Sequence, residues 1–244
     1  NYWAIRINQY VVEADTGMKA YDSLQYFKQM WIIVYTVAYF ALFTWIDTRY
    51  IRKEKILFNN LVFNLVIGVI MLTQGLYLLS ELRGLYLSYT PNIMYVIIRY
   101  IALLAFALLL WQTYKLLDAK AINFKNNKVR DLVLYGVVLW VVSSEWLHWT
   151  ELLGATANYK LGLSILWVSY GVFMLVKGIH QSKSYMRIAS ISVILFTLVK
   201  LFFYDIAHLS TISRVVVLVI LGVLLVIASF LYVKYDKKIR NNDK

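Results

Sequence analysis

The stretch that decides the fold is Thr197–Tyr235, TLVKLFFYDIAHLSTISRVVVLVILGVLLVIASFLYVKY. It reads as the end of one membrane-spanning helix, a short polar turn and a complete second span. Between Val215 and Leu231, only Gly222 and Ser229 interrupt the hydrophobic residues. Uninterrupted apolar runs of this kind are typical of helices whose solvent is the bilayer. The stretch therefore predicts a membrane protein.

The composition of the whole chain agrees with that class. Of the 244 residues, 61% are hydrophobic, the mean hydropathy is +0.63 and there is one proline, which excludes a water-soluble globule with a single core. The net charge of +12 would suggest nucleic acid in a soluble protein, but here it is expected to set membrane orientation, and no nucleic-acid partner is predicted. The chain has no cysteine, which excludes disulfides, thiolate metal sites and cysteine nucleophiles. No cofactor and no metal are expected.

Seven stretches are long enough to cross a membrane, because a hydrocarbon core about 30 Å thick needs roughly 20 helical residues. They run from Phe27 to Ile46, Leu57 to Leu79, Ile93 to Leu116, Leu132 to Trp149, Tyr159 to Ile179, Met186 to Ala207 and Arg214 to Tyr235. We predict an all-α integral membrane protein of about seven spans, of which Leu132–Trp149 has the weakest signal. Residues 1–26 form an extracytoplasmic or interfacial lead-in, residues 27–235 the membrane domain, and residues 236–244 a basic tail. Because the chain begins at Asn1 without Met, we expect a missing upstream part of a longer protein.

Basic residues alternate between the predicted loops. Asp47–Lys55, Lys115–Asp131, Lys177–Arg187 and the tail from Lys234 are rich in Lys and Arg, whereas the loops between them contain only Arg83. Short loops that carry Lys and Arg stay in the cytoplasm. We therefore expect a cytoplasmic C-terminus and an extracytoplasmic N-terminal side.

With this orientation, ionisable residues gather in the outer half of the predicted spans. They are Arg99, Glu145, His148, Lys200, Asp205, His208 and Arg214. The inner half is apolar apart from residues such as Asn59, Asn60 and Asn64. Ionisable side chains within spans are costly, so each is a candidate functional residue.

Two interpretations of this outer polar layer remain open. In one, the charged side chains reach the headgroups or form structural ion pairs between helices. In the other, Arg99, Glu145 and Lys200 line a water-accessible cavity that binds an anionic group. Asp205 is better placed to meet Arg214 across the turn than to pair with Lys200, which is about 140° away around an ideal helix.

The spacing E-x-x-H-x-x-E, formed by Glu145, His148 and Glu151, resembles a metal-ligand pattern. The neighbouring tryptophans fit an interfacial aromatic belt better, so a metal site is not predicted there.

The last third of the chain, Leu161–Tyr235, resembles the C-terminal part of a bacterial multi-spanning membrane family known as domain of unknown function 2339. The residues that carry the resemblance are Leu166, Trp167, Tyr170, Arg187, Lys200, Phe203, Asp205, Leu209, Arg214 and Gly222. The residues before Leu161 share only the general character of the family. The resemblance implies a multi-pass protein of the bacterial cytoplasmic membrane and implies no substrate.

The leading functional hypothesis is an inner-membrane protein of the cell envelope whose outer polar layer binds or passes an envelope component or docks a partner subunit. An enzyme acting on a lipid-linked or cell-wall saccharide is the second, with Glu145 or His148 as base and Arg99 or Lys200 as anion anchor. A purely structural membrane subunit is the third. Membrane lipids are expected partners in all three, and other membrane subunits are further candidates.

Overall fold

A computed structural model describes residues 17–51, 53–88, 93–118, 127–154 and 159–201, together with single positions between 215 and 230. Every regular element in the described part is helical, as the hydrophobic runs predict. The chain divides into two compact units, Asn1–Arg130 and Asp131–Lys244. We call them the N-terminal unit and the C-terminal unit.

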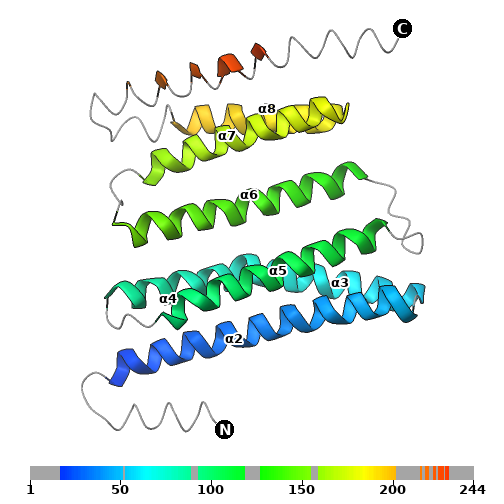
Figure 1. Cartoon of the computed structure of the whole chain (residues 1–244), viewed down its shortest axis with the longest axis vertical. Helices are drawn as coiled ribbons and strands as arrows, with labels where there is room; N and C mark the ends of the chain where they lie inside the picture. Colours follow the sequence, from blue (N-terminus) through cyan, green and yellow to red (C-terminus); the bar gives the residue numbers. More distant parts are fainter. Residues whose placement is uncertain are drawn as a thin grey trace. The chain divides into compact units, whose positions relative to one another are not determined.

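The N-terminal unit is a bundle in which two long helices, α2 (Gly17–Ile46) and α5 (Met94–Asp118), pack along each other. A third rod lies beside them and consists of α3 (Glu54–Ile70), the π-helical turn η2 (Met71–Gly75) and α4 (Leu76–Ser88) (Figure 1). Leu57 and Leu61 of α3 form a buried cluster with Leu116 of α5. Phe27 of α2 meets Tyr95, at the start of α5, edge to face, and Figure 1 shows that the two helices run in the same direction.

Two predicted loops of this unit prove to be largely helical. The region expected as the loop Asp47–Lys55 continues α2 through a π-helical turn, η1 (Asp47–Ile51), and α3 begins at Glu54. The expected loop Ser80–Asn92 is helical as far as Ser88. The predictions were wrong because charged residues mark the end of a hydrophobic stretch, while the helix itself continues into the interface.

Five described helices are long and apolar enough to cross a membrane: Leu24–Ile51, Lys55–Leu87, Met94–Leu117, Asn127–Leu152 and Tyr159–His180. They correspond to the first five predicted spans, including the weak fourth one. Helix α8 (Ser184–Lys200) covers the first part of the sixth. The rest of the sixth span and most of the seventh lie outside the described residues, so the total of seven stays a prediction.

In the C-terminal unit, α7 (Tyr159–His180) and α8 lie side by side as an antiparallel hairpin (Figure 1). Ser164, Gly171 and Gly178 recur every seven residues on α7, and all three are buried. A methyl group at Gly171 would lie 2.6 Å from Cγ1 of Ile194, and one at Gly178 would lie 3.1 Å from the backbone nitrogen of Arg187. Small residues thus bring the two backbones close together, which is how helices gain van der Waals contact in a bilayer.

The turn between α7 and α8 is much shorter than the loop Lys177–Arg187 that we expected. The Lys183 N–H donates to the Gly178 carbonyl at 2.9 Å, and the Ser182 N–H donates to the Ile179 carbonyl at 3.1 Å. This pair of bonds is the Schellman arrangement that closes helix C-termini. Ser182 takes the left-handed position with φ of 54°, where glycine is the usual residue.

Helix α6 (Asn127–Leu152) joins the hairpin through long polar side chains rather than through close backbone packing. Trp167 donates its indole N–H to the Ser143 hydroxyl at 2.8 Å, and the Tyr170 hydroxyl donates to the Tyr135 carbonyl at 2.8 Å. The Lys177 ammonium lies over the Tyr135 ring at 5.2 Å. Positions 135 and 143 share one face of α6, so this face carries a row of polar contacts to α7.

Because Gly171 lies close to Ile194, substitutions at Gly171 and at Gly136 are expected to differ in their effect on stability. Gly171→Leu is expected to lower stability by about 1–3 kcal/mol, because the larger side chain overlaps Ile194. The matched change Gly136→Leu on α6 meets open space and is expected to leave stability unchanged or higher. Thermal unfolding of both variants in detergent measures the difference. Equal losses in the two variants would contradict the packing described for α7 and α8.

Candidate functional site

The residues predicted for the outer polar layer are divided between the two units. Arg99 belongs to the N-terminal unit, whereas Glu145, His148 and Lys200 belong to the C-terminal unit. Asp205, His208 and Arg214 lie outside the described residues. The convergence of Arg99, Glu145 and Lys200 therefore stays a prediction, and each unit is described by itself.

Arg99 is one of the largest fully buried side chains of the described chain, with 1% of its surface exposed. It lies in the second turn of α5, within a candidate span. Arg83 on the neighbouring α4 is also buried and donates to the Ser80 hydroxyl at 2.9 Å. The N-terminal unit thus buries two guanidinium groups, which carry fixed positive charge and planar arrays of donors suited to anions.

Lys200 is the last residue of α8, and its ammonium donates to the Ser164 hydroxyl at 3.0 Å. Ser164 is buried near the start of α7. The contact ties the end of α8 to the beginning of α7 and holds the ammonium at a defined depth. Lys200 is partly buried.

Glu145 and His148 lie at the end of α6 that meets the beginning of α7. The indole N–H of Trp146 donates to the Tyr159 carbonyl at 3.4 Å, and the Trp146 ring occupies the space beside Gly162. His148 is buried and meets the Trp149 ring edge to face. Because Ser164 is only two residues from Gly162, the Lys200–Ser164 contact belongs to the same end of the C-terminal unit as Glu145.

The described residues contain no group of three or more His, Asp or Glu side chains able to hold a metal ion. The three residues of the E-x-x-H-x-x-E spacing, Glu145, His148 and Glu151, all lie on α6, which is helical through Leu152.

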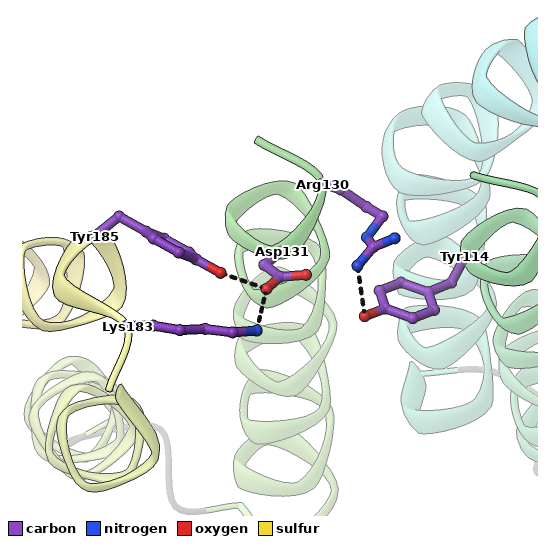
Figure 2. A network of polar contacts seen from close by, with 5 residues as sticks. All are labelled: Tyr114, Arg130, Asp131, Lys183 and Tyr185. Atoms are coloured by element: carbon purple, nitrogen blue, oxygen red, sulfur yellow. Dashed lines mark hydrogen bonds and ion pairs between the residues drawn. The ribbon is translucent and has the colours of Figure 1, made fainter. Parts of the chain in front are cut away.

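Asp131 forms a polar site that the sequence analysis missed. Its carboxylate oxygen Oδ2 accepts hydrogen bonds from the Lys183 ammonium at 2.7 Å and the Tyr185 hydroxyl at 2.6 Å. Figure 2 shows both donors pointing at Asp131, while the preceding residue, Arg130, points to Tyr114. The hydrogen bond to Asp131 raises the pKa of Lys183 above its ordinary value of 10.5. Asp131 was assigned to a basic loop, and nothing in its neighbours' sequence indicates burial.

A second missed site lies in the N-terminal unit, around Asp47. We expected Asp47 in a loop, but it is fully buried at the junction of α2 and η1. Its carboxylate contacts Asn60 of α3. The paired asparagines Asn60 and Asn64, spaced to share one helix face, were the available signal for a polar partner on α2.

Comparison with known proteins now adds a family. A sequence model described as "Predicted membrane protein (DUF2339)" matches residues 3–235. The chain belongs to the DUF2339 family. The match to DUF2339 covers every predicted span, so the family likeness extends far beyond the stretch Leu161–Tyr235 that first suggested it. The match supports the prediction of a multi-pass membrane protein and assigns the chain to a family of unknown function.

Searches among curated proteins and among solved structures give no match for this DUF2339 chain. Its function therefore has to be argued from the residues described above.

Removing Lys183 and removing Asp131 are expected to lower the free energy of unfolding by different amounts. The side chain of Lys183 is 36% exposed and that of Asp131 is 5% exposed. Lys183→Met leaves a buried carboxylate with fewer donors and is expected to cost about 1–3 kcal/mol. Asp131→Ala leaves an ammonium that reaches water, so a cost of about 1 kcal/mol or less is expected. Thermal unfolding of the two variants tests the order, and a larger loss for Asp131→Ala would contradict it.

The direction of the Lys183 pKa shift also sets a pH window. Because the folded pKa is raised, the contribution of the pair is fully present below pH 10.5 and is lost as the pH rises through the higher folded pKa. Wild type and Lys183→Met are therefore expected to differ in melting temperature at pH 8 and to converge at the alkaline end of the titration.

Proposed function

We propose that the protein is a seven-span protein of the bacterial inner membrane whose outer half binds an anionic group of an envelope component. The observation that carries the proposal is Arg99, an arginine buried to 1% exposure inside a candidate span. A cationic side chain at such depth is costly and is typically retained for a ligand or a defined partner.

Each unit has a cationic site at a similar distance from the start of a helix. Arg99 lies five residues after the start of α5, and Ser164, which accepts from Lys200, lies five residues after the start of α7. At 1.5 Å per residue, both positions are about 8 Å along their helices. In the proposed topology both helices start on the extracytoplasmic side, so each unit has one cationic site in its outer half.

An anionic lipid headgroup or a lipid-linked phosphate has the chemistry that this layer suits. Arginine binds phosphate and carboxylate oxygens with two parallel hydrogen bonds, and lysine adds a point charge. Ser164, Trp146 and Tyr159 add neutral polar groups at the same end of the C-terminal unit. The proposal covers binding of the anionic group, while chemistry on it would require a free base at the same level.

Binding is tested with native mass spectrometry of the protein released from nanodiscs that contain phosphatidylglycerol and phosphatidylcholine. Wild type is expected to retain phosphatidylglycerol, and Arg99→Gln and Lys200→Gln are each expected to lose at least about tenfold in retention, since each removes a charge-assisted bond of about 1.5–3 kcal/mol. Lys115→Gln is the matched control, because the exposed Lys115 ammonium lies over the Trp111 ring at the other end of α5.

Unchanged retention in the Arg99 and Lys200 variants would overturn the proposal. A fall in melting temperature with unchanged lipid retention would assign these side chains to the structural role instead.

The proposed topology is tested by cysteine labelling, which is unambiguous because the natural chain has no cysteine. Tyr50, 71% exposed in η1, and Leu153, 75% exposed after α6, are suitable positions for single cysteines. A membrane-impermeant maleimide is expected to label Leu153→Cys in intact spheroplasts and Tyr50→Cys only after lysis. The reverse pattern would invert the topology and, with it, the side on which Arg99 lies.

A further inference from the structure

Four polar side chains of the N-terminal unit form a buried group, here named the Asp47 cluster: Thr44, Asp47, Asn60 and Asn64. All are nearly or fully buried, and Asp47 is 0% exposed. Thr44 and Asp47 are three residues apart on the α2–η1 rod, and Asn60 and Asn64 are four apart on α3, so each pair shares one helix face. The two faces meet.

The contacts inside the cluster are all between side chains. The Asn60 amide donates to Oδ2 of Asp47. The Asn64 amide donates to the Thr44 hydroxyl oxygen at 2.9 Å, and the Thr44 hydroxyl lies 3.3 Å from the Asn64 amide oxygen. The other carboxylate oxygen of Asp47, Oδ1, is buried and has no hydrogen-bond partner.

The surroundings give this carboxylate no compensating charge within the described residues. The apolar cluster of Leu57, Leu61 and Leu116 lies next to Asn60. The neighbouring basic side chains of Arg49, Lys53 and Lys55 are exposed. Two polar residues of α5 lie at the same end of the unit as the cluster. Lys115 is exposed, and its ammonium lies over the Trp111 ring at 3.8 Å. Gln112, one turn before Leu116, is buried. A buried carboxylate oxygen without a hydrogen-bond partner is costly, so Oδ1 has room for a ligand interaction.

We propose that the Asp47 cluster is a binding site for a small monovalent cation of the sodium class. Its oxygen atoms come from a carboxylate, two carboxamides and a hydroxyl, and hard cations prefer such ligands. Asn60 and Asn64 can present oxygen instead of nitrogen by a half-turn of the amide group. One positive charge balances one carboxylate, whereas a divalent ion would leave an uncompensated charge in a buried site.

The backbone at this position adds an independent reason. Asp47 is the first residue of the π-helical turn η1, where the α-helical hydrogen-bond register changes. Such turns are often found at functional sites because they displace one residue from the regular ladder. The bound ion would link α2 to α3 at the side of the protein opposite to Arg99, so this site is independent of the anion-binding layer.

The test measures thermal unfolding of the full chain in zwitterionic detergent at constant pH and ionic strength, with sodium chloride replacing choline chloride. At sodium concentrations well above the dissociation constant, the melting temperature of wild type is expected to rise by roughly 5 °C. Asp47→Asn removes the charge at nearly constant shape and is expected to abolish the rise. Asp131→Asn, which changes a second buried aspartate in the part of the chain that the structure describes, is the matched control and is expected to keep it.

Two further variants cover the case in which Asp47→Asn does not fold. Thr44→Val and Asn64→Ala each remove one oxygen ligand and are expected to shift the midpoint of the sodium titration at least about tenfold upward, which corresponds to about 1.4 kcal/mol of binding free energy. Equilibrium dialysis with radioactive sodium is expected to find one ion per wild-type chain.

Three results would overturn the proposal. They are a melting temperature that does not depend on sodium, an equal sodium response in wild type and the Asp47 variant, and unchanged titration midpoints in both ligand variants. A melting temperature that depends on pH and not on sodium would assign the neutralising charge to a proton on Asp47.

Discussion

The constraint on which this structure depends is the cost of leaving a polar group without a partner inside a bilayer. Hydrocarbon offers no hydrogen bonds, so every buried amide, hydroxyl or charge must find its partner within the protein or a ligand. The chain meets this constraint in three ways. Hydroxyl groups such as that of Thr113 bond to the carbonyl one turn earlier, charged groups form pairs at helix ends, and buried polar clusters form between helices.

The C-terminal unit shows how differently two neighbouring helices can be held under this constraint. Helices α7 and α8 gain their contact from small residues, because Gly171 and Gly178 let the backbones approach. Helix α6 uses the opposite method, in which tryptophan and tyrosine side chains reach across to donate hydrogen bonds. Helix–helix hydrogen bonds of this type contribute only about 1 kcal/mol each in membranes, so their number along one face matters more than any single bond.

The sequence predicted the helices well and the polar contacts poorly, for physical reasons. Hydrophobic length is a one-dimensional property, and the first five spans follow from it, including the weak span that became α6. The burial of Asp47 and Asp131 depends on which residues from distant helices face them. Lys183, which pairs with Asp131, is 52 residues away in the sequence. Charge near the end of an apolar run indicated a loop in both cases, and only the three-dimensional arrangement shows that these carboxylates turn inward. Arg99 was predicted to be an intramembrane charge, because an arginine inside an apolar run is visible without knowledge of packing, and the structure buries its side chain.

The tight turn around Ser182 limits how this protein is assembled and how it moves. Only residues 181–183 connect α7 to α8, and two backbone hydrogen bonds close the connection. In the predicted topology, a connection this short requires α7 and α8 to enter the bilayer together as one helical hairpin. In the folded protein, the same turn and the close packing at Gly171 and Gly178 hold the two helices together. Among the described helices of this unit, α6 is the one whose long side-chain contacts can rearrange while the hairpin stays intact.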